Sequence, residues 1–185
     1  LSSVEREYLN HKHKGIRGTK PKLWEENQME YHYTAEKNIL MLMALMKAHD
    51  VKKIIASPGS MNITFVASLM QDPYFEIYSA PDERSAAYMA CGMAVSSGEP
   101  VALSCTGATA SRNYIPGLTE AFYRKLPVLA ITSTQHSGQV GHYVPQVIDR
   151  SVPLNDMVNL SVQIPLIHDD MDAWAANVSI NKALL

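Results

Sequence analysis

Short apolar runs alternate with longer helix-forming segments along most of this chain, and that alternation limits its fold more than any other feature. Four such runs lie at residues 53–57, 75–79, 101–105 and 128–132. Strands of this kind, without strict polar alternation, are typical of a parallel sheet that helices cover on both faces. Because strands and helices alternate, right-handed crossovers should connect them. The sequence therefore predicts an α/β fold: a three-layer α/β/α domain with a mostly parallel sheet.

Helices are expected before, between and after these strands. They are predicted at residues 34–49, 62–71, 82–97, 110–125 and from about 170 onward, with Thr34 as the N-cap of the first. A fifth strand is predicted at residues 158–164. The expected organisation is a charged N-terminal arm (1–33), a main domain (34–168) and a C-terminal helix (169–185) at an incomplete domain end.

Charge and composition argue against several classes of function. Sixteen Lys and Arg against 18 Asp and Glu give a net charge of −2, without the basic excess that nucleic-acid or anionic-membrane surfaces need. No apolar run approaches the roughly 20 residues of a membrane span. The two cysteines, Cys91 and Cys105, provide neither a disulfide framework nor zinc-ligand spacing. We therefore expect a cytoplasmic protein without nucleic-acid or membrane partners.

The loops that follow the strands form the candidate site, because ligands of parallel α/β sheets bind at the carboxyl ends of the strands. These loops are residues 58–61, 80–83, 106–111 and 133–146. The sequence contains no dinucleotide-binding, P-loop, zincin or serine-hydrolase motif. No metal-ligating set is predicted in this chain.

Glu83 begins the helix after the second strand and has two interpretations. It can simply oppose the positive end of the helix dipole, together with Asp82. Alternatively, it stands above a stripe of small residues on one helix face, formed by Ala86, Ala87, Ala90 and Ala94. Another helix could approach this stripe closely and bury Glu83 at an interface. Burial would raise the pKa of Glu83 and let it share a proton with a ligand nitrogen.

The other loops allow a structural or a functional interpretation. The small residues of 106–111 can reflect tight packing or a close approach of the backbone to a ligand, and the turn at 57–60 is similar. His136 and His142 share the loop after the fourth strand with Gln146. Loop histidines are ordinarily exposed to solvent, which leaves their role open.

Three segments resemble the pyrimidine-binding (PYR) N-terminal domain of thiamine-diphosphate enzymes. They are I-I-A-S-P-G-S at 54–60, D-E-R-S-A-A-Y-M-A-C-G-M-A at 82–94, and the longer segment 100–132 from P-V-A-L-S-C-T-G to L-P-V-L-A-I-T. The resemblance covers about residues 34–167. It implies thiamine diphosphate as the cofactor and an active site formed between two chains.

The resemblance also implies roles for individual residues. Glu83 stands where the family's glutamate hydrogen-bonds the pyrimidine ring of the cofactor and activates it, and is the expected catalytic residue. The expected cofactor-binding residues are Pro58, Gly59, Gly107, Ala108, Thr109 and Gln146. The expected substrate-side residues are Ser57, Ser60, His136 and His142.

Within this superfamily, S-P-G-S, D-E-R-S-A-A and G-H-Y-V-P-Q-V-I-D-R (141–150) resemble the 2-succinyl-5-enolpyruvyl-6-hydroxy-3-cyclohexene-1-carboxylate synthases of menaquinone biosynthesis, which act on 2-oxoglutarate and isochorismate. Two departures count against that exact activity. Met61 replaces an arginine expected after S-P-G-S, and residues 132–135 lack an arginine expected after the fourth strand. Arginine grips a carboxylate with two hydrogen bonds, which neither replacement can do. A split 2-oxo acid decarboxylase of the sulfopyruvate or phosphonopyruvate type and an acetolactate synthase-like enzyme remain alternatives.

The family's diphosphate- and magnesium-binding (PP) domain has no counterpart in this sequence. The resemblance therefore implies that this domain, which holds Mg²⁺, belongs to the same polypeptide or to a second one, and that this chain alone is inactive. A homodimer or homotetramer acting on a 2-oxo acid is the expected assembly. A non-catalytic interaction domain of the same fold is a further alternative, against which the presence of Glu83 argues.

Overall fold

The computed structural model describes residues 34–149 and 152–185, and the predicted N-terminal arm lies outside these ranges. The described part contains the following helices and strands in chain order: α2 (Lys37–Ala48), β1 (Lys53–Ala56), α3 (Ile63–Met70), β2 (Glu76–Ser79), α4 (Glu83–Ser97), β3 (Val101–Thr106), α5 (Ala108–Asn113), α6 (Ile115–Arg124), β4 (Val128–Ser133), the 3₁₀-helix η1 (Ser137–Gln139) and α7 (Asp170–Leu184). The four strands all lie within one residue of their predicted positions.

The four strands form one parallel sheet in the order β2-β1-β3-β4. The central strands β1 and β3 pair from Lys53 opposite Val101 to Ala56 opposite Ser104. The first crossover leads outward from β1 to β2, and the next returns past β1 to β3. The order of the strands therefore reverses between β1 and β3.

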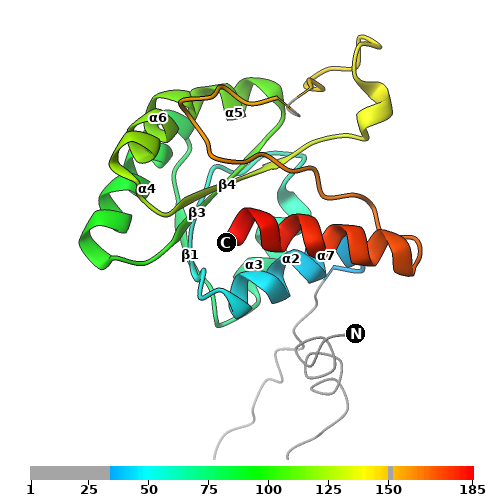
Figure 1. Cartoon of the computed structure of the whole chain (residues 1–185), viewed down its shortest axis with the longest axis horizontal. Helices are drawn as coiled ribbons and strands as arrows, with labels where there is room; N and C mark the ends of the chain where they lie inside the picture. Colours follow the sequence, from blue (N-terminus) through cyan, green and yellow to red (C-terminus); the bar gives the residue numbers. More distant parts are fainter. Residues whose placement is uncertain (1–33, 150–151) are drawn as a thin grey trace, which may run out of the picture. The chain divides into compact units, whose positions relative to one another are not determined.

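Helices cover both faces of the sheet, which confirms the predicted three-layer α/β/α architecture (Figure 1). One apolar core includes Ile55 and Leu103 from the strands and the small residues of α4. The other core includes Ile54 with residues of α2, α3 and α7. Ile54 and Ile55 enter opposite cores because successive side chains of a strand point to opposite faces. Both are fully buried, so the sheet is covered on both sides.

The small-residue stripe of α4 packs against α6 of the same chain. Ala86, Ala87, Ala90 and Ala94 are all buried. A Cβ added to Gly117 of α6 would lie 2.4 Å from the Cβ of Ala87, so the two helices are in direct contact. The predicted close approach of another helix to this stripe is confirmed, and that helix is α6 of the same chain, while Glu83 at the end of the stripe is half-buried.

Three local expectations also differ from the structure. The predicted strand at 158–164 is irregular backbone, and its apolar residues Val158 and Ile164 pack onto the two cores instead of pairing with a strand. The predicted helix 110–125 is two helices that meet at Tyr114, and Pro116 lies in the first turn of α6, where its missing N–H is tolerated. The N-cap of α2 is Glu36, not Thr34, whose hydroxyl instead accepts a hydrogen bond from the Glu36 N–H.

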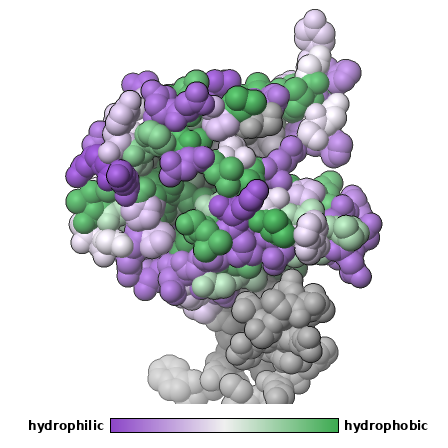
Figure 2. Space-filling model, viewed as in Figure 1, coloured by the Kyte–Doolittle hydropathy of each residue, from purple (hydrophilic) through white to green (hydrophobic). Residues whose placement is uncertain are grey.

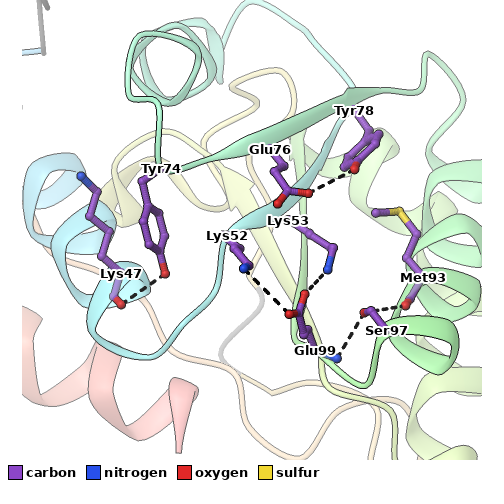
Figure 3. A network of polar contacts seen from close by, with 9 residues as sticks. All are labelled: Lys47, Lys52, Lys53, Tyr74, Glu76, Tyr78, Met93, Ser97 and Glu99. Carbon is purple, nitrogen blue, oxygen red and sulfur yellow. Dashed lines mark hydrogen bonds and ion pairs between the residues drawn. The ribbon is translucent and has the colours of Figure 1, made fainter.

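A polar network joins the amino ends of the strands, at the opposite end of the sheet from the candidate loops (Figure 3). Glu99, just before β3, forms ion pairs with Lys53 and Lys52 at the start of β1. Within the neighbouring strand β2, the Tyr78 hydroxyl donates to the Glu76 carboxylate at 3.3 Å. These contacts link the starts of β1 and β3.

The surface is mixed in polarity, and hydrophobic side chains reach it at several places (Figure 2). The exposed hydrophobic residues include Tyr88 and Met89 on α4 and Trp174 on α7. Among residues 34–149 and 152–185, no helix is both long and apolar enough to cross a membrane.

The contact between α4 and α6 predicts opposite effects for two glycine substitutions. Gly117→Ala places a methyl group 2.9 Å from the backbone carbonyl carbon of Ala87, which should lower the free energy of unfolding by about 1–3 kcal/mol. Gly92→Ala on α4 meets no atom within 4 Å and should raise it by about 0.5–1 kcal/mol through helix propensity. Urea unfolding measures both, and equal effects would contradict this packing.

The Glu99 network predicts a pH dependence of stability. The hydrogen bond from Lys53 holds the pKa of Glu99 below its ordinary value near 4.5. The stabilisation is therefore present above that pH and is lost as the pH falls through the lower pKa of the folded state. We expect the stability difference between the wild type and Glu99→Gln to shrink below about pH 4 in thermal unfolding. A difference that stays constant from pH 7 to pH 3 would exclude this contribution.

Candidate functional site

The carboxyl ends of β1 and β3 form the centre of the candidate site. The chain leaves β1 toward α3 and leaves β3 toward α5, on opposite sides of the sheet. In open α/β sheets, ligands bind at such a reversal of strand order, and we call the region between the loops 57–62 and 106–109 the crevice. The two departing loops touch closely, because a Cβ added to Gly59 would lie 2.5 Å from the Thr106 side chain. Only glycine lets the first loop approach Thr106 in this way.

Asn62 holds the turn after β1 in its shape. Its Oδ1 accepts from the Gly59 N–H at 2.8 Å, and its Nδ2 donates to the Ser57 carbonyl at 3.2 Å and to Ser104 Oγ at 3.0 Å. Asn62 is fully buried. The side chain therefore ties the turn to β3 and satisfies three polar groups that would otherwise be buried without partners.

Three of the predicted residues of this turn differ in exposure. Ser57 is buried, and its hydroxyl donates to the Ala80 carbonyl at 2.7 Å, which links the ends of β1 and β2. Pro58 and Ser60 are exposed at the rim. Pro58 and Ser60 are therefore accessible to a ligand, and Ser57 shapes the floor beneath them.

Gly107, Thr109 and Gln146 lie together on the far side of the crevice. Gln146 Oε1 accepts from the backbone N–H and the hydroxyl of Thr109, both at 3.1 Å. Gly107 has φ +22°, and a Cβ there would lie 2.7 Å from Gln146 Oε1, so glycine is required. Ala108 is half-buried at the first position of α5. The long loop after β4 thus returns to the loop after β3. The distance between Thr109 and Gln146 along the sequence does not reveal this contact.

Glu83 lies at the start of α4 and is not its cap. Asp82 is the N-cap, and its side chain accepts from the Ser85 N–H at 2.8 Å. Hydrogen bonds from Ser85 lower the pKa of Asp82. Glu83 is half-buried, and its Oε2 accepts from Asn113 Nδ2 at 3.2 Å. Asp82 caps the helix, so the Glu83 carboxylate is not needed for capping. The Asn113 amide orients this carboxylate.

Tyr114 lies at the junction of α5 and α6. Its side chain is 1% exposed, and its hydroxyl has no hydrogen-bond partner among the described residues. Burial raises the pKa of this phenol well above its ordinary value, with smaller raising contributions from Cys105 and Glu83 and a lowering contribution from Ser57. The phenol therefore stays protonated as a hydrogen-bond donor.

The two histidines of the long loop are exposed. His136 is the N-cap of η1, where its Nδ1 accepts from the Gly138 N–H at 3.0 Å. The backbone N–H of His142 donates to the Gln139 carbonyl at 3.2 Å. The contacts of His136 and His142 are thus local to their loop, and a substrate-side role for them remains a prediction.

Residues 34–149 and 152–185 contain no cluster of three or more His, Cys, Asp or Glu side chains that could hold a metal ion. Both cysteines are buried and neither forms a disulfide, and the Cys91 thiol donates to the Gly117 carbonyl at 3.3 Å. The described part of the site therefore offers hydroxyls, backbone amides and one oriented carboxylate.

Sequence reasoning missed three residues that shape this site: Asn62, Asn113 and Tyr114. Asn62 follows a Ser-Pro-Gly-Ser turn directly before a helix, a position where asparagine commonly binds turn backbone. That pattern could have pointed to it. No comparable pattern marks Asn113 or Tyr114, because their contacts depend on how α4 and α6 pack.

Solved structures share this fold. The chain superimposes on a thiamine diphosphate-dependent 4-hydroxybenzoylformate decarboxylase of Rhodococcus jostii with a TM-score of 0.62 at 21% identity, over 80% of this chain and 28% of the other. A benzoylformate decarboxylase of Polynucleobacter necessarius gives a TM-score of 0.56 at 19% identity, over 63% of this chain and 22% of the other. The fold is therefore that of a domain of thiamine-diphosphate-dependent enzymes.

Sequence comparison gives the family. Residues 40–152 match the N-terminal TPP binding domain of thiamine pyrophosphate enzymes, and the chain belongs to this family. Relatives named 2-succinyl-5-enolpyruvyl-6-hydroxy-3-cyclohexene-1-carboxylate synthase occur in Phocaeicola vulgatus and Bacteroides thetaiotaomicron, at 38% and 37% identity over 83% of this chain. The chain spans 28% of the length of each of these two relatives.

The hydrogen bonds of Asn62 predict that the turn after β1 depends on this side chain. Asn62→Ala removes the partners of Gly59, Ser57 and Ser104, and it should lower the free energy of unfolding by about 2–4 kcal/mol. The exposed Asn159→Ala serves as the control and should change it by less than about 0.5 kcal/mol. A comparable loss in both variants, measured by urea unfolding, would argue against the role of Asn62.

Proposed function

We propose that this chain supplies the cofactor-activating half of the active site of a thiamine-diphosphate-dependent enzyme that decarboxylates a 2-oxo acid and transfers the remaining unit to an acceptor. The observation that carries the proposal is the position of Glu83. It follows the carboxyl end of β2 in the fold of a thiamine-diphosphate family, is not needed for capping, and is oriented by Asn113. A carboxylate so placed can exchange a proton with a ring nitrogen.

The described residues fit a pyrimidine ring in the crevice. Gly59 and Gly107 permit close approach of the backbone, and the turn at 57–60 and the Thr109–Gln146 pair flank the space. Pro58, Gly59, Gly107, Ala108, Thr109 and Gln146 would contact the ring. Ser57, Ser60, His136 and His142 are proposed to lie toward the substrate. When bound, thiamine diphosphate supplies a stabilised carbanion equivalent for cleavage next to the carbonyl group of the substrate.

The main task of this chain is to control one proton at Glu83. The carboxylate is half-exposed in the described structure, so water still solvates it. Covering it would remove this water, and burial disfavours the charged form of a carboxylate. The carboxylate and a ring nitrogen could then share the proton, and general acid–base catalysis requires a group that can transfer its proton in this way.

A diphosphate-binding domain, in the same polypeptide or in a second one, would complete the site. No described group of this chain forms a metal cluster, and we propose that the other domain holds Mg²⁺ and the diphosphate. Pairing of the two domains in a homodimer or homotetramer would cover Glu83. We further propose a cytoplasmic location, which the family of enzymes supports.

The relatives support a carboligase of the 2-succinyl-5-enolpyruvyl-6-hydroxy-3-cyclohexene-1-carboxylate synthase type as the first candidate. Met61, half-buried at the crevice turn, favours a second candidate, a 2-oxo acid decarboxylase or a carboligase with another acceptor, because methionine cannot grip a carboxylate. Product analysis with a panel of 2-oxo acids, with and without isochorismate, separates the two.

Glu83→Gln tests the proposal in the complete enzyme. The amide keeps the size of the side chain but cannot exchange the proton, so we expect kcat to fall by about 10²- to 10⁴-fold. Steady-state kinetics measure kcat, and calorimetric titration with thiamine diphosphate measures cofactor affinity separately.

Glu120→Gln is the matched control, because Glu120 is a partly exposed carboxylate on α6 that forms an ion pair with Arg124 of its own helix. It should leave kcat within about twofold of the wild type. Near-normal activity of Glu83→Gln would refute the proposed role of Glu83.

A further inference from the structure

The outward side of α7 is apolar, although a surface helix ordinarily turns polar side chains toward water. Met171, Trp174 and Val178 are 69%, 63% and 41% exposed. With the exposed Lys182 they follow the spacing i, i+3, i+7 and i+11, which places all four side chains on one face of the helix. We call these four residues the α7 stripe.

The opposite side of α7 is already buried in the domain. Ala176 and Ile180 are buried, and Ile180 belongs to the core that contains residues of α2 and α3. Asn181 Oδ1 lies 2.9 Å from Nε2 of His49 at the end of α2, and Figure 1 shows the two helices side by side. A helix that is apolar on both sides is typical of the interior of a larger protein.

α6 shows the pattern that a surface helix ordinarily has. Its partly exposed residues include Glu120 and Arg124, which form an ion pair with each other, and its buried residues are Gly117, Leu118 and Ala121. The sequence of α6 thus separates a polar from an apolar face, and α7 departs from this pattern. The α7 stripe is therefore a surface that the described residues leave uncovered.

The residue types of the stripe define the surface that would fit it. Tryptophan is enriched among the residues that dominate the binding energy of interfaces, so Trp174 is the expected anchor. Lys182 forms no ion pair within residues 34–149 and 152–185. A complementary surface offers apolar side chains to Trp174 and a carboxylate or carbonyl oxygen to Lys182.

Two observations favour another part of the same polypeptide over a second copy of the chain. The chain spans 28% of the length of its relatives from Phocaeicola vulgatus and Bacteroides thetaiotaomicron, so most of each relative lies outside the matching part. The stripe contains four side chains, whereas a stable dimer interface uses about 20–30 residues a side. A smaller contact suffices between domains of one polypeptide, because the covalent link gives them a high effective concentration.

We propose that the α7 stripe is a docking surface for another domain of the same polypeptide, which presents an apolar patch to Trp174 and an oxygen acceptor to Lys182. α7 and α4 lie on opposite faces of the sheet. The contact at α7 is therefore separate from the one proposed to cover Glu83, and this inference does not rest on the proposed function.

Thiol labelling of the full-length protein tests whether the stripe is covered. Met171→Cys and Met70→Cys are a matched pair, because both methionines are 69% exposed in this chain and Met70 lies on α3. The labelling rate in urea divided by the rate in the native protein, each corrected for the wild type, gives the protection of each thiol.

We expect protection of at least about tenfold at position 171, since burial of a large apolar side chain contributes a factor of this order, and little protection at position 70. An unprotected thiol at position 171 would overturn the inference.

Trp174→Glu in the full-length protein identifies what covers the stripe. A carboxylate there should uncouple the two domains, so that calorimetry shows this domain unfolding separately while ultracentrifugation shows the oligomeric state of the wild type. Met70→Glu is the control and should change neither measurement.

A lower oligomeric state of Trp174→Glu would assign the stripe to a second copy and refute the inference, as would wild-type behaviour in both measurements. Neither measurement involves Glu83 or thiamine diphosphate, so either result leaves the proposed function untouched.

Discussion

The pairing of β1 with β3 is the constraint on which the rest of this structure depends. These two strands lie side by side in parallel, yet the chain leaves them toward opposite faces of the sheet. The two cores, the crevice at the carboxyl ends and the contact of Gly59 with Thr106 all follow from this arrangement. The polar side chain of Asn62 spans the same two strands and holds the crevice turn in place.

The second requirement is the close contact of α4 with α6. Alanines on α4 and Gly117 on α6 let the two backbones approach. Because α6 is held there, the junction that precedes it brings Asn113 and Tyr114 to the first turn of α4. The packing of α4 against α6 thus determines which groups lie near Glu83.

The chemistry proposed for the site depends on a change of environment at Glu83. Within this chain the carboxylate is oriented but only half-buried. Orientation comes from groups of the chain itself, whereas desolvation is proposed to come from another domain. This division fits a family whose N-terminal domain binds thiamine pyrophosphate, and it explains why the proposed catalytic residue need not lie in a closed cavity here.

The alternation of apolar runs and helices was enough to predict the three-layer fold, the four strands and the position of Glu83 after β2. Each of these depends on hydrophobic patterns within short stretches of the chain. The predicted strand at 158–164 was wrong, since apolar residues that cover a core resemble a strand in sequence. The partner of the alanine stripe, and the roles of Asn62, Asn113 and Tyr114, depend on contacts between segments distant in sequence. Only tertiary packing decides which buried polar group meets which partner, because each such contact is set by the positions of two separately packed elements.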